Sequence, residues 1–474
     1  MKNNDGYLKM DDGFSYDQAL MEAERCLLCH EPPCSKGCPA KTDPGTFIRK
    51  FRMRNVTGAI RTIKENNILG GACGVLCPTC RLCEKECSAT GIDKPIRIGK
   101  IQRFLIEHSW QVGFKTFDNP MSTDPGRQAE KIAIIGAGPA GLSCAAELAK
   151  SGYSVTIFEE REEAGGVLRY GVPSFRFSRS FLKNDLRDLE DLGVKIKCSS
   201  AIQKKGDVEK LLEQGFNAVF IGVGLWAPIS LKKVPEDDSN IFSSVRFLET
   251  FRQEKFKELE KVCRGKIVAV IGGGSVAMDC ARVALKLGAK DVNLIYRRSY
   301  SQMPAEPDEK IEALEEGIHF ILLNQPTDYC RDSKGKLKGI NLIRTRLAGA
   351  DSKSGGSAAA RGSGRRKPVE IPGSEWVMEC DTAIEAIGNK AAADSGDWYP
   401  SVSVNSEMLV QADKETGQTN MEGIFAGGDI VRGPGTVVQA VADGKTAAKS
   451  IIGWLEKKRL KPAGYVSSRK EKKV

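Results

Sequence analysis

No stretch of the sequence is apolar for long enough to cross a membrane, and the opening MKNNDGYLKMDDGF has no apolar core segment. A membrane helix needs about 18 consecutive apolar residues, so we expect a cytoplasmic chain that makes no membrane contact. Histidine is also scarce, and the chain's 3 histidines show no metal-ligand spacing. No Ser/His/Asp set, FMN-type barrel or glutamine-hydrolysing module is recognisable, which argues against a site for a final substrate.

Basic residues exceed acidic ones, 71 against 61, which gives a formal net charge of +10. Much of the excess lies after residue 456, where the basic side chains face only Glu471. Such blocks of like charge are usually solvated, so we predict a basic tail and no nucleic-acid-binding surface. At 474 residues, with 49 glycines and 41% apolar residues, the chain has room for about three globular α/β domains.

The segment 131–159, KIAIIGAGPAGLSCAAELAKSGYSVTIFE, reads as strand, glycine turn, helix and second strand. Gly136 permits the tight turn, Gly138 lets the backbone approach a pyrophosphate, and Gly141 lets the helix pack closely on the strand. Glu159 lies where a carboxylate would accept the ribose hydroxyls. A glycine turn alone is weak evidence, but one set between two strands and closed by an acid predicts a dinucleotide site.

The same pattern returns at 266–298, with strand KIVAVI, turn GGGSVA (272–277) and strand DVNLIY. Two internal copies make coincidence improbable. The second copy has no acid at the end of its second strand, where Arg297 and Arg298 stand instead. A carboxylate there suits the 2′-hydroxyl of NAD, whereas guanidinium groups suit the 2′-phosphate of NADPH. We therefore favour NADPH, with NAD still possible; a solvated arginine pair is the alternative.

Nine of the 15 cysteines crowd the first ninety residues, which in a cytosolic chain favours metal binding over disulfides. They form two runs, each after an expected helix (about 16–25 and 46–66): Cys26, Cys29, Cys34 and Cys38; then Cys73, Cys77, Cys80, Cys83 and Cys87. Thiolates at such spacings bind iron–sulfur clusters, and the last cysteine of a run commonly ligates the other cluster. We predict two clusters, but spacing alone cannot divide nine cysteines between them. Structural zinc sites are the rival, disfavoured by the Cys-Pro endings and the nucleotide units.

The remaining cysteines are scattered, and none forms the C-x-x-C of a thioredoxin-reductase-like dithiol mechanism. A glycine pair, Gly165-Gly166, would let its loop pass tightly over a flavin; a plain connecting loop is the alternative. Far downstream, GIFAGGDI (423–430) reads as a strand that delivers Asp429 to the ribityl chain of FAD. A helix from about Thr436 would aim its positive end at the flavin pyrimidine edge. Two segments that lie far apart in the sequence would thus form one flavin site. This predicts that a second nucleotide-binding domain is inserted between them, and that strand DTAIEAIG is its last strand. The segment 348–366 reads as a flexible loop between strands.

The stretches RCLLCHEPPCSKGCPAKTDPGTFIR, CGVLCPTCRLCEKEC and PIRIGKIQRF resemble the N-terminal domain of the dihydropyrimidine dehydrogenase family and its separate bacterial flavin subunit. More distantly, they resemble the small subunit of NADPH-dependent glutamate synthase. The resemblance covers nearly the whole chain and implies two 4Fe-4S clusters: one on Cys26, Cys29, Cys34 and Cys87, the other on Cys38, Cys77, Cys83 and Gln102. Cys73 and Cys80 would be spare, although Cys80 could replace Gln102. A further basic residue of the family falls on Pro304.

The fold expected is α/β: a helical two-cluster domain (1–118), a Rossmann-like FAD domain in two segments (119–239 and 389–474), and a Rossmann-like NAD(P) domain inserted at 240–388. The cofactor-binding residues that motifs and resemblance together predict are Leu76, Gly136, Gly138, Pro139, Ala140, Gly141, Glu159, Gly165, Gly166, Val167, Arg176, Gly273, Gly274, Ser275, Val276, Arg297, Arg298, Ala386, Gly388, Gly428, Asp429, Thr436 and Val437.

These expectations describe an oxidoreductase that oxidises NAD(P)H at FAD and passes electrons singly through two clusters to a partner subunit. The head suggests a dihydropyrimidine dehydrogenase, whose partner would carry FMN, iron–sulfur centres and the pyrimidine site in a hetero-oligomer. GRRKPVEIPGSE and AGGDIVRG resemble the glutamate synthase small subunit more than the head does. A flavin-bifurcating transhydrogenase or ferredoxin reductase would use the same layout. From a different class, a zinc-stabilised nucleotide-binding module without turnover would also carry these motifs.

Overall fold

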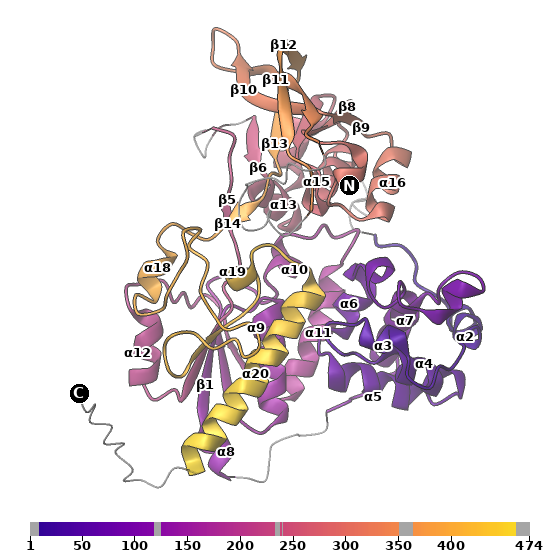
Figure 1. Cartoon of the computed structure of the whole chain (residues 1–474), viewed down its shortest axis with the longest axis vertical. Coiled ribbons are helices and arrows are strands. Elements are labelled where there is room, and N and C mark those ends of the chain that lie inside the picture. Colours follow the sequence, from indigo (N-terminus) through magenta and orange to yellow (C-terminus); the bar gives the residue numbers. More distant parts are fainter. Residues whose placement is uncertain (1–8, 118–124, 233–237, 239, 350–363, 461–474) are drawn as a thin grey trace.

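The computed structural model describes residues 9–117, 125–232, 238, 240–349 and 364–460. Figure 1 shows a helical head and a first Rossmann domain side by side, with a second Rossmann domain above them. Among the described residues, no helix has both the length and the hydropathy that a membrane crossing requires. The α/β fold class predicted from the sequence is confirmed.

The head packs short helices around an aromatic and aliphatic core that includes Phe47, Phe51 and Phe104. Its elements are α2 (Tyr16–Glu24), α3 (Pro33–Lys36), α4 (Pro44–Arg52), α5 (Val56–Asn66), α6 (Gly70–Leu76), η1 (Thr79–Arg81), η2 (Ser88–Gly91) and α7 (Ile98–Gln111). The single helix expected over 46–66 was wrong: it is divided into α4 and α5. Arg54 adopts a left-handed backbone (φ 64°), and the Asn55 side chain accepts from the Gly58 amide to begin a new helix.

The first Rossmann domain has a parallel sheet in the order β15-β4-β1-β2-β3. Its elements are α8 (Pro125–Ala129), β1 (Lys131–Ile135), α9 (Pro139–Lys150), β2 (Ser154–Phe158), α10 (Val167–Tyr170), α11 (Arg179–Asp191), β3 (Lys195–Lys197), α12 (Asp207–Glu213), β4 (Ala218–Ile221), α18 (Ser395–Trp398), β15 (Ile424–Ala426), α19 (Asp429–Arg432) and α20 (Val437–Leu460). Every residue of β4 is buried, as expected where helices cover both faces of a parallel sheet. Strand β15 therefore returns the distal segment to this sheet.

Helix α20 lies along α9 and brings the end of the chain against the first glycine turn (Figure 1). The contact is tightest at Gly444, where an added Cβ would lie 2.2 Å from the Ala140 carbonyl oxygen and 2.8 Å from the Cys144 nitrogen. Only glycine fits between these two backbones. The basic tail expected after residue 456 begins inside α20; residues 461–474 lie outside the described parts.

The second Rossmann domain has a parallel sheet in the order β6-β13-β7-β8-β9 and a separate antiparallel sheet β10-β11-β12. Its elements are β6 (Ile241–Ser243), α13 (Ser244–Arg252), α14 (Phe256–Cys263), β7 (Ile267–Ile271), α15 (Ser275–Lys286), β8 (Asp291–Tyr296), η3 (Tyr300–Gln302), α16 (Pro307–Glu315), β9 (His319–Leu322), β10 (Asn324–Arg331), β11 (Leu337–Leu347), β12 (Pro368–Glu379) and β13 (Thr382–Glu385). The sequence predicted β7, β8 and β13 but not the antiparallel sheet. Most of the loop predicted at 348–366 lies outside the described residues.

The chain crosses between the two Rossmann domains twice, and the two crossings run side by side. β5 (Ala227–Pro228) pairs antiparallel with β14 (Asn389–Lys390), and the Ile229 amide donates to the Gly388 carbonyl at 3.0 Å. The second domain thus enters and leaves the first through a single two-stranded link, which confirms the predicted insertion.

Two arginines, Arg252 and the half-buried Arg176, fix how the Rossmann domains sit against each other. Arg252 of α13 is fully buried and donates to the Arg169 carbonyl (2.8 Å), the Phe177 carbonyl (2.8 Å) and the Ser174 hydroxyl (3.0 Å). No carboxylate of the described residues binds it; burial, with Arg169 and another arginine nearby, lowers its pKa to about 9. Arg252 therefore ties the second domain to backbone oxygens of the first.

Arg176 crosses in the opposite direction, from the first domain to the second. Its guanidinium lies 2.8 Å from an Asp279 oxygen and 2.6 Å from a Glu309 oxygen. Both carboxylates are largely buried, and burial raises the pKa of Asp279 to about 6. The three side chains form one ion triad, Arg176–Asp279–Glu309, between the domains.

The head is held by both Rossmann domains. A buried ion pair joins Lys64 of α5 to Asp188 of α11 at 2.9 Å, and Asp185 accepts the Ala72 amide at 2.8 Å in the first turn of α6. On the other side, Arg81 pairs with Glu306 of the second domain at 2.8 Å. The head's cysteine-bearing loops are thus positioned from outside the head.

Replacing Gly444 with alanine should destabilise the protein, because the new methyl group would strike the α9 backbone. Overpacking of this kind typically costs about 1–3 kcal/mol, so we expect a lower midpoint of thermal unfolding. Gly453→Ala is the matched control on α20, since a Cβ there meets nothing within 4 Å and alanine favours a helix. Equal midpoints for the two variants would contradict this account of the contact.

Arg176→Gln should destabilise by about 3–5 kcal/mol, because it leaves two buried carboxylates without their partner. Adding Asp279→Asn should recover most of the loss, as a double-mutant cycle in urea would measure. The native pKa of Asp279 is raised to about 6, so its protonated form is favoured as pH falls below that value. The destabilisation should therefore be smaller at about pH 5 than at about pH 8. A pH-independent loss would argue against the triad.

Candidate functional site

The first glycine turn leaves room for a ligand only at its centre. Gly136 has a φ of 94°, and a Cβ there would lie 2.6 Å from the Gly222 carbonyl oxygen. At Gly141 a Cβ would lie 2.0 Å from the Gly136 oxygen, whereas at Gly138 it would meet nothing within 4 Å. Two glycines are therefore required by packing, and the third exposes the open backbone that a pyrophosphate needs. Pro139 and Ala140 begin α9 beyond it.

Glu159 closes this turn from the end of β2. Its carboxylate accepts the Ala137 amide at 2.7 Å and the Arg161 amide at 3.0 Å. The side chain is buried, and burial raises its pKa while the two amides lower it. Its binding of ribose hydroxyls stays a prediction, but the acid lies at the turn as expected.

The Gly165-Gly166 pair packs directly on the turn. Both residues have positive φ (128° and 53°), and a Cβ on Gly166 would lie 2.8 Å from the Gly138 Cα. The Gly165 amide donates to the Ala137 carbonyl at 2.9 Å. This loop therefore passes as close to the first glycine turn as the prediction requires. Val167, the next residue, is 44% exposed.

The distal segment joins the same site, as predicted. Gly428 has a φ of 79°, a Cβ on it would lie 3.0 Å from the Ala140 Cβ, and its amide donates to Asp443 at 2.8 Å. Asp429 accepts the Gly435 amide at 3.1 Å, and burial raises its pKa to about 6. Helix α20 begins at Val437, one residue after the predicted start at about Thr436.

Arg432 and Asp443 form an ion pair at this site that the sequence did not reveal. Arg432 also donates to the Gln439 carbonyl at 3.1 Å, and burial lowers its pKa. Asp443 precedes the glycine at which α20 meets α9. The Asp-Gly pair inside an otherwise helical pattern was the one feature of the sequence that could have pointed to this ion pair.

The second glycine turn repeats the first with bulkier neighbours. Gly272 has a φ of 146°, and a Cβ there would lie 2.3 Å from the Ala386 carbonyl oxygen. At Gly273 a Cβ would lie 2.6 Å from the Tyr296 ring, whereas at Gly274 the nearest atom is a Pro304 carbon at 3.7 Å. Ser275 and Val276 begin α15, and Val276 is 44% exposed. Gly388 has a φ of 121° and lies at the interdomain link.

Arg297 and Arg298 follow β8 but differ in their surroundings. Arg298 is buried, and its Nε donates to the Arg366 carbonyl at 2.9 Å. Arg297 is exposed, and its carbonyl accepts the Thr345 hydroxyl at 2.9 Å. Arg297 is therefore the better placed of the two to meet a ligand phosphate.

Arg176, predicted as a flavin contact, has its guanidinium engaged by Asp279 and Glu309. The contacts that the structure gives it belong to the domain junction, and a flavin contact stays a prediction.

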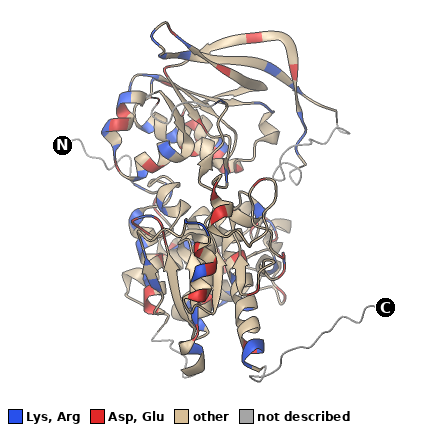
Figure 2. Ribbon diagram, turned by 90° about the vertical axis from the view of Figure 1, so that its left-hand side faces the viewer, with Lys and Arg blue, Asp and Glu red and all other residues tan. Residues whose placement is uncertain are grey.

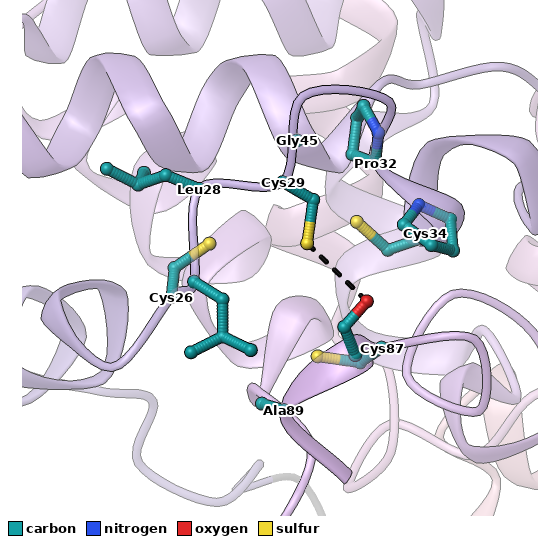
Figure 3. A pocket seen from close by; sticks show the side chains of 11 residues that line it. Cys26, Leu28, Cys29, Pro32, Cys34, Gly45, Cys87 and Ala89 are labelled. Carbon is teal, nitrogen blue, oxygen red and sulfur yellow. Dashed lines mark hydrogen bonds between the residues drawn. The ribbon is translucent and has the colours of Figure 1, made fainter. Parts of the chain in front are cut away.

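Four cysteines of the head, the first thiol group, point toward a common centre (Figure 3). Cys26, Cys29, Cys34 and Cys87 line one pocket. Within the described ranges, no three His, Cys, Asp or Glu side chains are arranged to hold a single metal ion. Burial raises the pKa of Cys34 to about 11, so a bound cation is needed to stabilise its thiolate.

The second thiol group comprises Cys38, Cys73, Cys77 and Cys83. Burial raises the pKa of Cys77, and the neighbouring Cys73, Cys83 and Cys38 raise it further. Cys73, predicted from the resemblance to be spare, therefore lies among these thiols. Gln102 is buried and its Nε2 donates to the Gly70 carbonyl at 2.7 Å, which leaves the carboxamide oxygen as the atom that could ligate a metal.

Cys80 lies apart from both groups. Its thiol is 3.9 Å from a Glu306 oxygen, and its charged neighbours are Glu306, Asp308, Arg81 and Glu84. The side chain is exposed. Of the two cysteines predicted to be spare, Cys73 and not Cys80 is near the second group.

The two thiol groups differ in their distance from the first Rossmann domain. Cys38, Cys73 and Cys77 pack against the core that contains Ile132 and Ile134 of β1. Cys26, Cys34 and Cys87 pack only against the head's own core, to which Cys83 of the second group also belongs. The second group thus lies at the boundary between the head and the first glycine turn's domain. Leu76, another predicted contact, precedes Cys77 and packs against the same shared core.

Comparison with known families gives two matches. Residues 3–114 match the model described as dihydropyrimidine dehydrogenase domain II, 4Fe-4S cluster. Residues 130–444 match the pyridine nucleotide-disulphide oxidoreductases. The predicted iron–sulfur head is confirmed, and the zinc alternative is set aside.

Several relatives are similar over nearly the whole chain. The glutamate synthase (NADPH) small chain of Escherichia coli K12 is 32% identical, covering 95% of this chain and 94% of its own length. The NAD-dependent dihydropyrimidine dehydrogenase subunit PreT of the same organism is 36% identical, covering 92% and 94%. The beta subunit of NADP(+)-dependent formate dehydrogenase from Moorella thermoacetica is 36% identical over 91% of this chain, which spans 61% of that protein.

Solved structures agree on the fold of the two Rossmann domains. Mycobacterium tuberculosis FprA in complex with NADPH aligns with a TM-score of 0.57 at 20% identity, over 70% of this chain and 85% of FprA. T. acidophilum thioredoxin reductase aligns with a TM-score of 0.50 at 19% identity, over 69% and 98%. The match over residues 130–444 shows that the chain belongs to the pyridine nucleotide-disulphide oxidoreductase family, as an FAD- and NAD(P)H-dependent oxidoreductase with a 4Fe-4S head.

Proposed function

We propose that the chain is the electron-input subunit of a larger enzyme. In this role it oxidises NADPH and delivers electrons one at a time to a partner catalytic subunit. The observation that carries this proposal is the placement of the second thiol group against the core of the first Rossmann domain. One set of proposed cluster ligands would then lie beside the FAD domain, and the other set would lie within the head.

The residues of both nucleotide sites support this assignment. FAD would be held by the open backbone at Gly138, by Glu159, and by Asp429 at the distal segment. NADPH would be held by the turn at Gly274 and by Arg297. When bound, FAD takes up a hydride from a nicotinamide and releases electrons one at a time. The protein's own contribution is to orient the two rings, which the Arg176–Asp279–Glu309 triad assists by fixing the domains.

For the clusters, we assign the first thiol group to one 4Fe-4S centre. We assign Cys38, Cys77, Cys83 and Gln102 to the other, with Cys73 as the alternative to Gln102. A buried thiol with a raised pKa is a poor ligand until a metal ion stabilises its thiolate charge. The backbone that carries these cysteines is already fixed, which favours assembly of the cluster. Arg52 donates to the Cys26 carbonyl at 2.7 Å and holds one ligand loop.

The partner we propose is the catalytic subunit of a dihydropyrimidine dehydrogenase, with FMN and iron–sulfur centres, forming a hetero-oligomer. Support comes from the head's match to that enzyme's domain II and from the PreT relatives. One observation favours the glutamate synthase small subunit instead: the PreT relatives are named NAD-dependent, whereas Arg297 suits NADPH.

The first test is an anaerobic titration of the purified holoprotein with NADPH and NADH, followed by flavin absorbance and cluster electron paramagnetic resonance. We expect NADPH to bleach the flavin and then reduce the clusters at lower concentration than NADH. A candidate partner subunit is then added together with its substrate, either uracil or glutamine and 2-oxoglutarate. We expect turnover with only one of these combinations of partner and substrate. A protein that holds flavin but no iron would refute the proposal.

The second test compares Cys77→Ser with Cys80→Ser. Cys77→Ser should lose about half of the bound iron, because one of two clusters loses a ligand, and NADPH should still reduce the flavin. Cys80→Ser should keep the full iron content, since its thiol faces Glu306. Adding Cys73→Ser and Gln102→Leu separately identifies the fourth ligand by the same iron assay. Iron loss from Cys80→Ser would overturn the ligand assignment.

A further inference from the structure

The β11–β12 hairpin reaches the end of β8, where the second nucleotide unit would meet the adenosine ribose. The Thr345 hydroxyl of β11 donates to the Arg297 carbonyl at 2.9 Å. Just before β12, the Arg366 carbonyl accepts the Arg298 Nε at 2.9 Å, and the Arg366 amide donates to the Gln302 side chain at 2.9 Å. The hairpin is therefore fastened to both arginines that follow β8.

This fastening gathers four arginines, which we call the arginine cluster: Arg297, Arg298, Arg365 and Arg366. Arg365 lies close enough to Arg297 to help lower the pKa of that guanidinium, together with burial and Arg298. None of the four pairs with a carboxylate within the described parts of the chain. Like charges held together without counter-charges favour binding of an anion.

The members of the arginine cluster have different tasks. Arg298 is buried and spends its Nε on the hairpin backbone, so it fixes the hairpin. Arg366 has its amide and carbonyl engaged, and its side chain is exposed. Arg365 is half-buried and acts on Arg297. Arg365 precedes Arg366, whose carbonyl lies 2.9 Å from the Arg298 Nε, so the hairpin carries Arg365 beside Arg297.

The expected anion follows from the position of the arginine cluster. In a Rossmann unit the residue after the second strand meets the 2′ position of the adenosine ribose. Pro304, beside Gly274, brings no charge to this region. Guanidinium groups bind phosphate in a bidentate manner, so a second arginine from outside the Rossmann unit would strengthen 2′-phosphate recognition.

We propose that Arg365, carried by the β11–β12 hairpin, is a specificity-determining residue that binds the 2′-phosphate of NADPH together with Arg297. The inference rests on the proposed NADPH preference and extends it to an element outside the βαβ unit. The antiparallel sheet then has a role in choosing the nucleotide.

The test measures binding of 2′,5′-ADP and of 5′-AMP, which lacks the 2′-phosphate, to the holoprotein by calorimetry. Arg365→Gln should weaken 2′,5′-ADP binding about tenfold or more, as expected for one lost charge-assisted hydrogen bond. Binding of 5′-AMP should not change. Arg344→Gln, which removes the same charge from β11 at a position that pairs with Asn324, is the matched control and should leave both affinities unchanged.

The outcomes separate this inference from the proposed function. If the wild type binds both ligands equally, the NADPH preference itself fails, and the inference fails with it. If the wild type prefers 2′,5′-ADP and Arg365→Gln keeps that preference, only the role of Arg365 is overturned. If Arg365→Gln also weakens 5′-AMP binding, the two affinities are measured again for Arg365→Lys, which keeps the charge but not the bidentate fork. Weaker binding of 2′,5′-ADP alone would then support the role of Arg365, and unchanged binding of both ligands would overturn it.

Discussion

One largely buried ion triad, together with Arg252, fixes how the two Rossmann domains sit against each other. Arg176 leaves the first Rossmann domain to pair with Asp279 and Glu309 of the second, which would otherwise be buried without a counter-charge. Removing such a partner costs far more than the pair contributes, so the triad favours this arrangement of the two domains. Glu309 also shares a capping box with Glu306, which pairs with Arg81 of the head. Head and both domains therefore meet at the start of α16.

The head is not an independent metal-binding unit in this structure. Helix α6, which leads to Cys77, begins against Asp185 of the first domain, and α5 is fastened by the Lys64–Asp188 pair. Loss of the first domain would leave Lys64 without its counter-charge and the α6 amides without their acceptor. Correct placement of the second thiol group thus requires a folded neighbour. Elsewhere in the described parts of the chain, acidic and basic residues are interspersed, as Figure 2 shows.

Both nucleotide units could be predicted because their requirements are local: Gly136 and Gly272 need positive φ and have no room for a side chain. The break at Arg54 could not, since neither glycine nor proline marks it. Spacing likewise could not show that Cys80 faces Glu306 while Cys73 joins the other thiols. The partners of Arg176 lie over a hundred positions away, beyond any local pattern.

The two-stranded link of β5 and β14 has a consequence for the history of the fold. Its strands are hydrogen-bonded neighbours, so the ends of the inserted domain lie together and the host sheet is not stretched to accommodate it. Insertions are tolerated where the termini of a domain are close and the receiving site is a loop. The second domain could therefore have entered an ancestral chain at one loop, without any change to the iron–sulfur ligands.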